Sequence, residues 1–507
     1  MKRKELLYEA GYGLCFDCDG EVTGVACDTR AVKAGNMFVA LKGQRFDGHT
    51  LISDAAGRGA TCAITEYDVP DAEIPCVCIP DTREALARLS DAFYGHPSKH
   101  VTLIGVTGTN GKTTVTEILR SILTESGMRV GTVGTLGATS DGRVLDTECA
   151  DVTARMTTPD PPVFYRLLSE MRDDGCDAVI TEATSHASAL RKLAPLTFDL
   201  MLFTNLTHDH LDFHGSMAAY GEAKAALFRQ TRRALICLDG SENDAFPKQL
   251  ADRASAYGAE TRTCSVRPET NADFLLLETE SSFETGTAFE LLAKDGKCTF
   301  RSDYFGVCSA MNLAQSAAAA RMLGIPDESI RNALARFRGV RGRMERIALP
   351  GADFSVYVDF AHTPDAMEHL LKTVRRVKRP DERVVVLFGC GGDRDPLKRK
   401  DMAIAVSRYA DLAYITSDNS RSEDPSAIIK DILKGMNKEK PFCVIPSRRV
   451  AIETAVCEAR AGDILLLCGK GHETYEIDRE GVHPFYEADA VRAAFQKRMK
   501  GSRRKRV

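Results

Sequence analysis

The stretch "VTLIGVTGTNGKTT", residues 101–114, indicates the class of fold to which the chain belongs. An apolar run typical of a buried strand leads into a turn that contains Gly108 and Gly111, and a helical pattern follows from Thr113. Backbone N–H groups in such a turn, together with the amino end of the following helix, form a binding place for phosphate groups. The common phosphate-loop pattern would place its first glycine at position 106, where this chain has Val106. The sequence therefore predicts a phosphate loop of unusual length.

The residues of this loop have separate expected roles in holding ATP and Mg²⁺. Lys112 would reach the β- and γ-phosphates, and the hydroxyl group of Thr113 or Thr114 would contact Mg²⁺. The predicted nucleotide-binding residues of the loop are Gly108, Thr109, Asn110, Gly111, Lys112, Thr113 and Thr114.

Apolar runs of the same kind recur along the chain, with helical patterns of 10–15 residues between them. Examples are "DAVIT" (177–181), "DLMLFT" (199–204), "RVVVLF" (383–388) and "DILLLC" (463–468). This alternation is typical of parallel sheets that are covered by helices on both faces. We therefore expect an α/β fold.

Two polar segments divide the chain, which at 507 residues is too long for one compact core. They are "YGHPSKH" (94–100) and the basic, glycine-broken "RFRGVRGRME" (336–345). We expect three domains, at residues 1–98, 99–338 and 339–507.

Composition excludes several classes of protein. The net charge is −4, so no overall field attracts nucleic acid, and no apolar stretch is long enough for a signal peptide or a membrane span. The 16 cysteines are scattered without zinc-like spacing, which predicts reduced thiols in a cytoplasmic protein.

Residues 497–507 hold seven Lys or Arg and no acid. We expect a solvated, frayed terminus there, and a tail that anchors to a surface or contacts RNA is the alternative.

Polar clusters follow two other predicted strands. Glu182 begins "EATSH" (182–186), and His210 lies within "TNLTHDHLDFH" (204–214). Ligand groups in parallel sheets gather at the carboxyl ends of strands, so both side chains are expected beside the phosphate loop, in a two-metal arrangement for phosphoryl transfer. The histidines of the second cluster also allow a zinc site, which is less favoured because no thiol or carboxylate stands at helical spacing; they are His208, His210 and His214.

Several motifs together resemble the Mur ligases, and the resemblance covers nearly the whole chain. In order they are "TGTNGKTT" (107–114), "TNLTHDHLDFHG" (204–215), "YGEAKAALF" (220–228), "GRME" (342–345), "VDFAHTPDAM" (358–367), "FGCGGDRD" (388–395), "DNSRSEDP" (418–425) and "GKGHE" (469–473). They are most similar to the members that add the third amino acid of the stem peptide. The resemblance implies a UDP-binding α/β domain, a central P-loop ATPase-type domain with a parallel sheet, and a C-terminal Rossmann-like domain. It also explains Val106, because this family uses the shorter loop.

The resemblance implies an ATP-dependent amide ligase. A substrate carboxylate receives the γ-phosphate of ATP, and an amine then attacks the acyl phosphate. Thr113 and Glu182 match ligands of one Mg²⁺, and His210 matches a ligand of a second. Lys224 matches a lysine that CO₂ converts to a carbamate. Further nucleotide contacts are implied for Asn312, Arg343 and Asp359.

The acceptor implied by the resemblance is UDP-N-acetylmuramoyl-L-alanyl-D-glutamate. Its UDP-sugar part matches the segment "CDTRAVKAGNMFVALKGQRFDGH" (27–49), through Thr29, Gly43, Gln44 and Arg45. Its muramoyl-dipeptide part matches Thr157, Thr158 and Ser185. The arginine expected ten residues after Glu182 is replaced by Lys192, with Arg191 beside it, so that contact stays open.

The amine implied by the resemblance is meso-diaminopimelate. Arg421 and Arg394 would bind its distal carboxylate, because arginine forms a bidentate pair with that group. The other matching positions are Asp418, Asn419, Gly469 and Glu473. Ser420 replaces a proline of the family motif, which leaves the loop less preset and keeps L-lysine open as the amine.

Two other functions share part of this pattern. A relative of folylpolyglutamate synthase would have the phosphate loop, but the UDP-type segment before residue 98 argues against it. A non-catalytic ATP-binding regulator would not need Lys112, Glu182, His210 and Lys224 together. We therefore expect a monomeric cytoplasmic enzyme that binds neither nucleic acid nor membrane.

Overall fold

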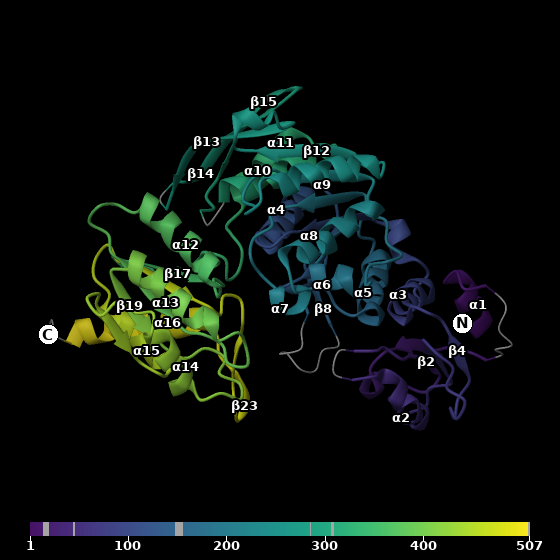
Figure 1. Ribbon diagram of the computed structural model, residues 1–507. Coiled ribbons are helices and arrows are strands. Elements are labelled where there is room, and N and C mark those ends of the chain that lie inside the picture. Colours follow the sequence, from purple (N-terminus) through teal and green to yellow (C-terminus); the bar gives the residue numbers. More distant parts are fainter. Residues whose placement is uncertain (14–19, 44–45, 148–155, 284, 306–308, 505–507) are drawn as a thin grey trace. The chain divides into compact units, whose positions relative to one another are not determined.

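The computed structural model describes residues 1–13, 20–43, 46–147, 156–283, 285–305 and 309–504 (Figure 1). Two predicted substrate contacts, Gln44 and Arg45, lie outside these ranges. The chain forms two compact units, which are described separately. The first comprises residues 1–277, 291–298 and 312–333, and the second comprises 278–290, 299–311 and 334–507.

A small parallel sheet lies at the amino end of the first unit. Its strands pair in the order β1 (Gly24–Ala26), β2 (Asn36–Val39), β3 (Cys62–Thr65) and β4 (Cys76–Cys78). Met37 and Val39 of β2 share a core with helices α1 (Arg3–Glu9) and α3 (Thr82–Phe93), whereas Phe38 packs with α2 (Ile52–Gly57). Because neighbouring strand residues point to opposite faces, this buried run covers both faces of the sheet with helices.

The central sheet of the first unit surrounds β5 (Thr102–Thr107). The strand β5 pairs in parallel with β9 (Ala178–Glu182) on one side and β10 (Leu200–Phe203) on the other. Beyond β10 come β11 (Arg233–Cys237), β12 (Glu260–Ser265) and β13 (Phe274–Ser282). The helix α5 (Pro161–Asp173) packs Phe164 and Leu168 against Leu103 and Val179. The order β10-β5-β9 brings three strand ends together, with that of β5 in the middle.

The other edge of this sheet departs from the parallel arrangement. The strand β6 (Val130–Gly134) is parallel to β9, but β7 (Gly137–Ser140) and β8 (Arg143–Leu145) are antiparallel additions. Only Thr135 and Leu136 separate β6 from β7, and so short a connection can join antiparallel strands only.

The remaining helices of the first unit are α4 (Lys112–Glu125), α6 (Ser185–Ala189), α7 (Leu211–His214), α8 (Met217–Ala225), α9 (Ala245–Ala256) and most of α10 (Ser309–Met322) and α11 (Asp327–Arg336). The strands β14 (Gly286–Ala293) and β15 (Gly296–Ser302) follow β13 along the chain, and each has residues in both units.

The second unit contains a predominantly parallel sheet with helices on both faces. Its strand order is β16 (Glu345–Arg346), β17 (Ser355–Asp359), β21 (Ile464–Cys468), β18 (Val384–Phe388), β19 (Leu412–Ile415) and β20 (Phe442–Val444). One face packs against α12 (Pro364–Val377), α13 (Leu397–Tyr409) and α14 (Pro425–Leu433), and the other against α15 (Arg448–Glu458) and α16 (Glu487–Arg504). A hairpin of β22 (Tyr475–Asp478) and β23 (Gly481–Pro484) precedes α16. The predicted α/β fold with three sheet-containing domains is confirmed: the small amino-terminal sheet and most of the central sheet belong to the first compact unit, and the third sheet belongs to the second.

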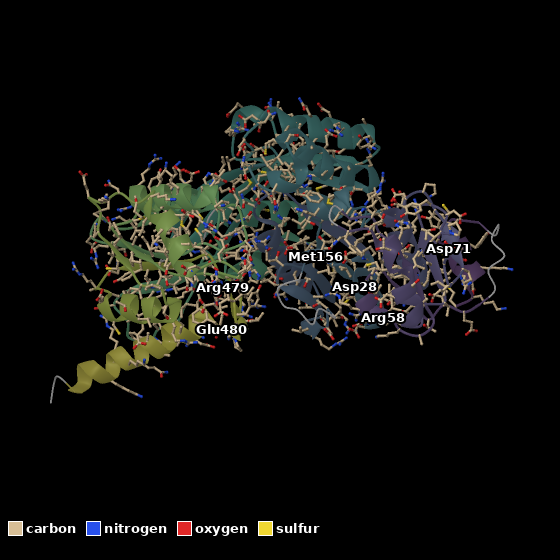
Figure 2. All side chains as sticks on the ribbon, turned by 60° about the horizontal axis from the view of Figure 1, so that its bottom comes forward. Asp28, Arg58, Asp71, Met156, Arg479 and Glu480 are labelled. Carbon is tan, nitrogen blue, oxygen red and sulfur yellow. The ribbon has the colours of Figure 1, made fainter. Side chains whose placement is uncertain are left out.

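The basic end of the chain is more ordered than expected. The helix α16 continues through Arg504, and Figure 2 shows its last turns extending from the sheet domain. Lys497 pairs with Glu453 of α15 at 2.8 Å, and Arg498 donates to the carbonyl oxygens of Val456 and Ala459, each at 2.8 Å. The helix thus continues through Arg504, and its contacts with α15 and the residue after it reach Arg498.

A buried ion pair joins the same two helices. Arg448 of α15 and Glu487 of α16 are 2.8 Å apart, and neither side chain is exposed to solvent. Arg448 also donates to the carbonyl oxygens of Ser417 at 3.1 Å and Cys468 at 2.8 Å. This pair therefore connects the two outer helices to the carboxyl ends of β19 and β21.

Glu487→Ala is expected to lower the free energy of unfolding of the C-terminal sheet domain by about 3–5 kcal/mol, because it leaves Arg448 buried without its counter-charge. Calorimetry of thermal unfolding would measure this loss. Glu453→Ala is the matched control, since it breaks the exposed pair between the same helices, and it should cost no more than about 1 kcal/mol. Equal losses of stability in the two variants would contradict the stabilising role of the buried Arg448–Glu487 pair.

Candidate functional site

The phosphate loop joins β5 to α4 through a sharply turned backbone. Gly108 and Gly111 have φ values of 147° and 88°, which side-chain-bearing residues rarely adopt. A Cβ atom on Gly108 would also collide with the hydroxyl group of Thr204. The two glycines therefore permit both the turn and its close approach to the end of β10.

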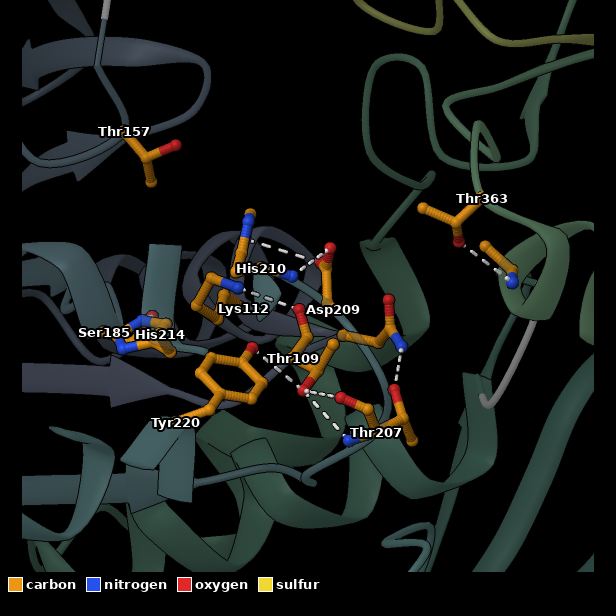
Figure 3. A network of polar contacts seen from close by, with 12 residues as sticks. Thr109, Lys112, Thr157, Ser185, Thr207, Asp209, His210, His214, Tyr220 and Thr363 are labelled. Carbon is orange, nitrogen blue, oxygen red and sulfur yellow. Dashed lines mark hydrogen bonds and ion pairs between the residues drawn. The ribbon is translucent and has the colours of Figure 1, made fainter. Parts of the chain in front are cut away.

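The segment after β10 holds this loop in place (Figure 3). The backbone N–H of Asn110 donates to Oδ1 of Asn205 at 2.9 Å, and the hydroxyl group of Thr204 donates to the carbonyl oxygen of Asn110 at 2.6 Å. The hydroxyl group of Thr109 accepts from the backbone N–H of Thr207 at 3.0 Å and lies 3.1 Å from that of Tyr220. The loop is thus held by the segment that follows β10 and by Tyr220 of α8.

Lys112 is the first residue of α4 and folds back over the loop. Its ammonium group donates to the carbonyl oxygens of Gly108 at 2.9 Å and Thr109 at 2.8 Å. Phosphate oxygens carry more negative charge than these carbonyls and form stronger bonds with ammonium groups. We therefore expect a bound triphosphate to draw Lys112 onto itself.

Glu182, the last residue of β9, meets the amino end of α4. Its Oε2 accepts from the hydroxyl group of Thr113 at 3.1 Å and from that of Thr135 at 3.0 Å. Its Oε1 accepts from the backbone N–H of Thr135 at 2.9 Å. A carboxylate and a hydroxyl group so close together are suitable ligands for Mg²⁺, which keeps several waters and phosphate oxygens in its shell. Glu182 and Thr113 therefore fit the predicted magnesium site.

His210 stands at the start of α7 with a left-handed backbone, at φ 54°. Burial lowers the pKa of its imidazole below the ordinary value, and the positive charge of Lys112 acts in the same direction. A neutral imidazole is the form that ligates metals. Among the described residues, no group of three or more His, Cys, Asp or Glu is arranged to hold a metal ion.

Lys224 of α8 is almost completely buried, with 1% of its surface exposed. Its ammonium nitrogen lies 2.7 Å from the carbonyl oxygen of Gly108 and 4.4 Å from the ring centre of Tyr220. Burial holds its pKa well below the ordinary value, and the charge of Lys112 contributes to the same effect. A buried lysine of this kind favours the neutral amine.

Three predicted substrate residues gather at the same edge of the sheet. Thr157 lies 3.2 Å from the hydroxyl group of Thr135, and Thr158 donates to the carbonyl oxygen of Glu182 at 2.8 Å. Ser185 lies 3.0 Å from Nε2 of His214. Lys192 is also buried here, where it pairs with Asp160 at 2.8 Å and donates to the carbonyl oxygen of Thr158 at 3.3 Å.

The predicted UDP-sugar residues lie after β1 and β2. Thr29 begins a short 3-10 turn and is buried, and the backbone N–H of Gly43 donates to the carbonyl oxygen of Phe46 at 2.8 Å. Both positions therefore follow the carboxyl ends of neighbouring parallel strands, where α/β sheets bind ligands.

The further nucleotide contacts are divided between the two units. Asn312 lies beside the phosphate loop, since a Cβ atom on Gly111 would come 2.9 Å from its Oδ1. In the second unit, the carboxylate of Asp359 accepts from the backbone N–H groups of Met344 and Ala361, each at 2.8 Å. The guanidinium of Arg343 lies 4.7 Å from the ring centre of Phe360.

The predicted amine-binding residues form a cluster in the second unit. Asn419 donates to Oε2 of Glu473 at 2.8 Å, and Gly469 has φ 114° with no room for a side chain beside Asp418. Arg421 donates to the carbonyl oxygens of Gly392 at 2.8 Å and Asn419 at 3.3 Å. Arg394 is exposed on the neighbouring loop.

One member of this cluster was missed by the sequence analysis. Lys470 is fully buried and donates to Oδ1 of Asn419 at 2.8 Å. Its position inside the motif "GKGHE" is the only signal that could have pointed to it.

A phosphate loop lies at the centre of a mainly parallel sheet, and the hydroxyl group of its threonine donates to a carboxylate at the end of the neighbouring strand. This arrangement is that of a P-loop nucleotide-binding enzyme. Residues 106–320 match the Mur ligase middle domain, 342–471 the Mur ligase glutamate ligase domain, and 21–94 the Mur ligase family catalytic domain. The chain belongs to the Mur ligase family.

Proteins similar to this chain carry a more specific name. Relatives from Geobacillus thermodenitrificans and Clostridioides difficile are named UDP-N-acetylmuramoyl-L-alanyl-D-glutamate–2,6-diaminopimelate ligase. Each is 37% identical and covers 94% of this chain and 96% of the relative. A solved structure of a ligase with the same name covers 98% of this chain and 100% of its own, with 28% identity and a TM-score of 0.68. Among the described helices, none is both long and apolar enough to cross a membrane.

Proposed function

We propose that this protein is an ATP-dependent ligase that joins meso-diaminopimelate to UDP-N-acetylmuramoyl-L-alanyl-D-glutamate, in peptidoglycan precursor synthesis in the cytoplasm. The observation that carries the proposal is its 37% identity, over 94% of the chain, to ligases that bear this name. The contact of Thr113 with Glu182 beside the phosphate loop supports ATP use. We also propose that the three domains divide near residues 98 and 338 and hold the UDP-sugar, the ATP and the amino acid, respectively.

The reaction has two chemical steps. The substrate carboxylate attacks the γ-phosphorus of ATP, which forms an acyl phosphate and releases ADP. The amine then attacks the acyl carbon, and phosphate leaves as the amide forms. Lys112 and the N–H groups of the loop would bind the phosphates and offset their growing charge. Thr113 and Glu182 would hold one Mg²⁺, which supplies further charge neutralisation when bound.

The proposal includes a carbamate on Lys224. Carbon dioxide adds to a neutral amine, and the burial of Lys224 favours that form. The product would be an anion near the cation of Lys112, at a place where His210 could share a second Mg²⁺ with it. This modification would convert a buried amine into a metal ligand.

The complete reaction can be tested by measuring phosphate release from ATP in the presence of the acceptor and the amine. We expect release only when both are present, together with Mg²⁺. A folded wild-type protein that releases no phosphate with meso-diaminopimelate or L-lysine would refute the ligase proposal.

Selectivity for the amine is expected to depend on Arg421. A bidentate arginine–carboxylate contact, together with the penalty for leaving Arg421 unmatched, should favour meso-diaminopimelate over L-lysine by about 10²–10⁴-fold in kcat/KM. Arg421→Ala should remove most of this preference, while Arg408→Ala, on the exposed side of α13, should retain it. A preference for L-lysine in the wild type would contradict the specificity and leave the ligase assignment standing.

A further inference from the structure

Lys470 lies at the centre of a buried charged cluster in the second unit. It follows β21, its side chain is 0% exposed, and its ammonium group donates to Oδ1 of Asn419 at 2.8 Å. The same nitrogen lies 3.4 Å from Oε2 of Glu473 and 3.8 Å from Oδ1 of Asp418. One lysine thus contacts three residues that are candidates for binding the amine.

These contacts determine which way the amide of Asn419 points. Its oxygen accepts from Lys470 and from the backbone N–H of Ile477 at 3.0 Å, so its nitrogen is left to donate to Glu473 at 2.8 Å. Without such contacts, an amide group can rotate by about 180° at little cost, which would exchange the positions of its donor nitrogen and acceptor oxygen. Lys470 therefore orients Asn419, and Asn419 in turn orients the carboxylate of Glu473.

The negative charges in this cluster outnumber the positive charge of Lys470. Arg448 and Glu487 form a separate buried ion pair, which adds no net charge. When both are ionised, Asp418 and Glu473 carry two negative charges, and Lys470 carries one positive charge. Burial raises the pKa of Glu473, and the charge of Lys470 opposes that rise. Although burial alone would raise the pKa of Asp418, the charges of Lys470 and Arg448 outweigh it and lower that pKa. The side chains of Asp418, Glu473 and Lys470 thus have a net charge of −1, which one ammonium group would balance.

We propose that Lys470 is a positioning residue for amine selection: it orients Asn419 and Glu473 and limits the site to one unbalanced negative charge, so that a single ammonium group binds. This inference rests on the proposed function, because it concerns the amine of that reaction. Without Lys470, two carboxylates would share the site, and like charges so close together disfavour the ionised state of both. Lys470 would act only through its neighbours and need not touch the substrate.

The test uses the full-length Lys470→Met variant, which retains most of the side-chain volume and loses the charge. We expect the KM for meso-diaminopimelate to rise by about 10–100-fold, since a buried charge-assisted contact is lost and its partners are released. The KM values for ATP and for the UDP-linked acceptor should change by less than about threefold. A general structural defect would alter all three KM values. Lys372→Met removes an exposed lysine of α12 and should leave every constant unchanged.

A double-mutant cycle with Glu473→Gln shows whether Lys470 acts through its neighbours. In the Glu473→Gln background, Lys470→Met should raise the KM for the amine by less than about threefold, because the partner that it orients is already impaired. The double variant also retains the net charge of −1, so it should fold even if Lys470→Met alone does not. Equal effects of Lys470→Met in both backgrounds, or an unchanged KM in a folded Lys470→Met protein, would overturn the proposal.

The wild-type arm of the same assay separates the two hypotheses. A wild type without phosphate release would refute the proposed function. A wild type that turns over either amine, alongside a Lys470→Met variant with the same KM for that amine, would refute only the role of Lys470.

Discussion

Lys112→Ala is expected to lower the rate of phosphate release by about 10³-fold or more, while the protein remains folded. Lys112 is the only cation in residues 105–114, and its ammonium group bonds to two carbonyl oxygens of the loop, those of Gly108 and Thr109. Losing it would leave the charge that develops on the transferred phosphoryl group without the cation of the loop. The measurement is kcat for phosphate release at saturating ATP.

The control for this experiment is Arg120→Ala, which removes a cation from the same helix. Arg120 pairs with Glu117 at 2.9 Å, away from the loop, so its loss should change kcat by less than about twofold. Thermal unfolding of both variants would show that the fold is retained. Near-normal phosphate release from folded Lys112→Ala would refute the assignment of the phosphate loop.

Lys224→Ala is expected to cost about 10²–10³-fold in kcat, because it removes the proposed carbamate and with it a metal ligand. Short carboxylic acids such as acetate should restore part of the activity, since they can fill the space left by the side chain and supply a carboxylate. The measurement is phosphate release with and without acetate, in ordinary and in CO₂-depleted buffer. Wild-type activity should fall in the depleted buffer and return when bicarbonate is added.

Lys248→Ala removes an exposed lysine of α9 and is the control for Lys224→Ala. It should retain wild-type activity and show no response to acetate. Carbamylation would be refuted if Lys224→Ala were fully active in CO₂-depleted buffer. A different result would be that acetate restores no activity while bicarbonate still stimulates the wild type. That result would support the carbamate and contradict only the expectation that acetate can replace it.

Much of the fold follows from local patterns in the sequence. The apolar strand, the turn with Gly108 and Gly111 and the helix that follows are determined over about a dozen residues, because strand burial and left-handed glycines are local properties. The same holds for the buried runs that became β9, β18 and β21. The antiparallel strands β7 and β8 were not predicted, since they are short and, in Val144, expose an apolar side chain.

The candidate site depends on contacts between distant parts of the chain. Thr113 meets Glu182 because β5 pairs directly with β9, and Lys224 reaches the carbonyl oxygen of Gly108 from a helix more than a hundred residues later. The sequence alone placed these residues at strand ends and in motifs, but the strand order β10-β5-β9 brings them together. The role of Lys470 likewise could not be predicted from the sequence alone. Its residue type is usual for a solvated surface, and only the packing of the loops after β19 and β21 buries its charge among Asp418, Asn419 and Glu473.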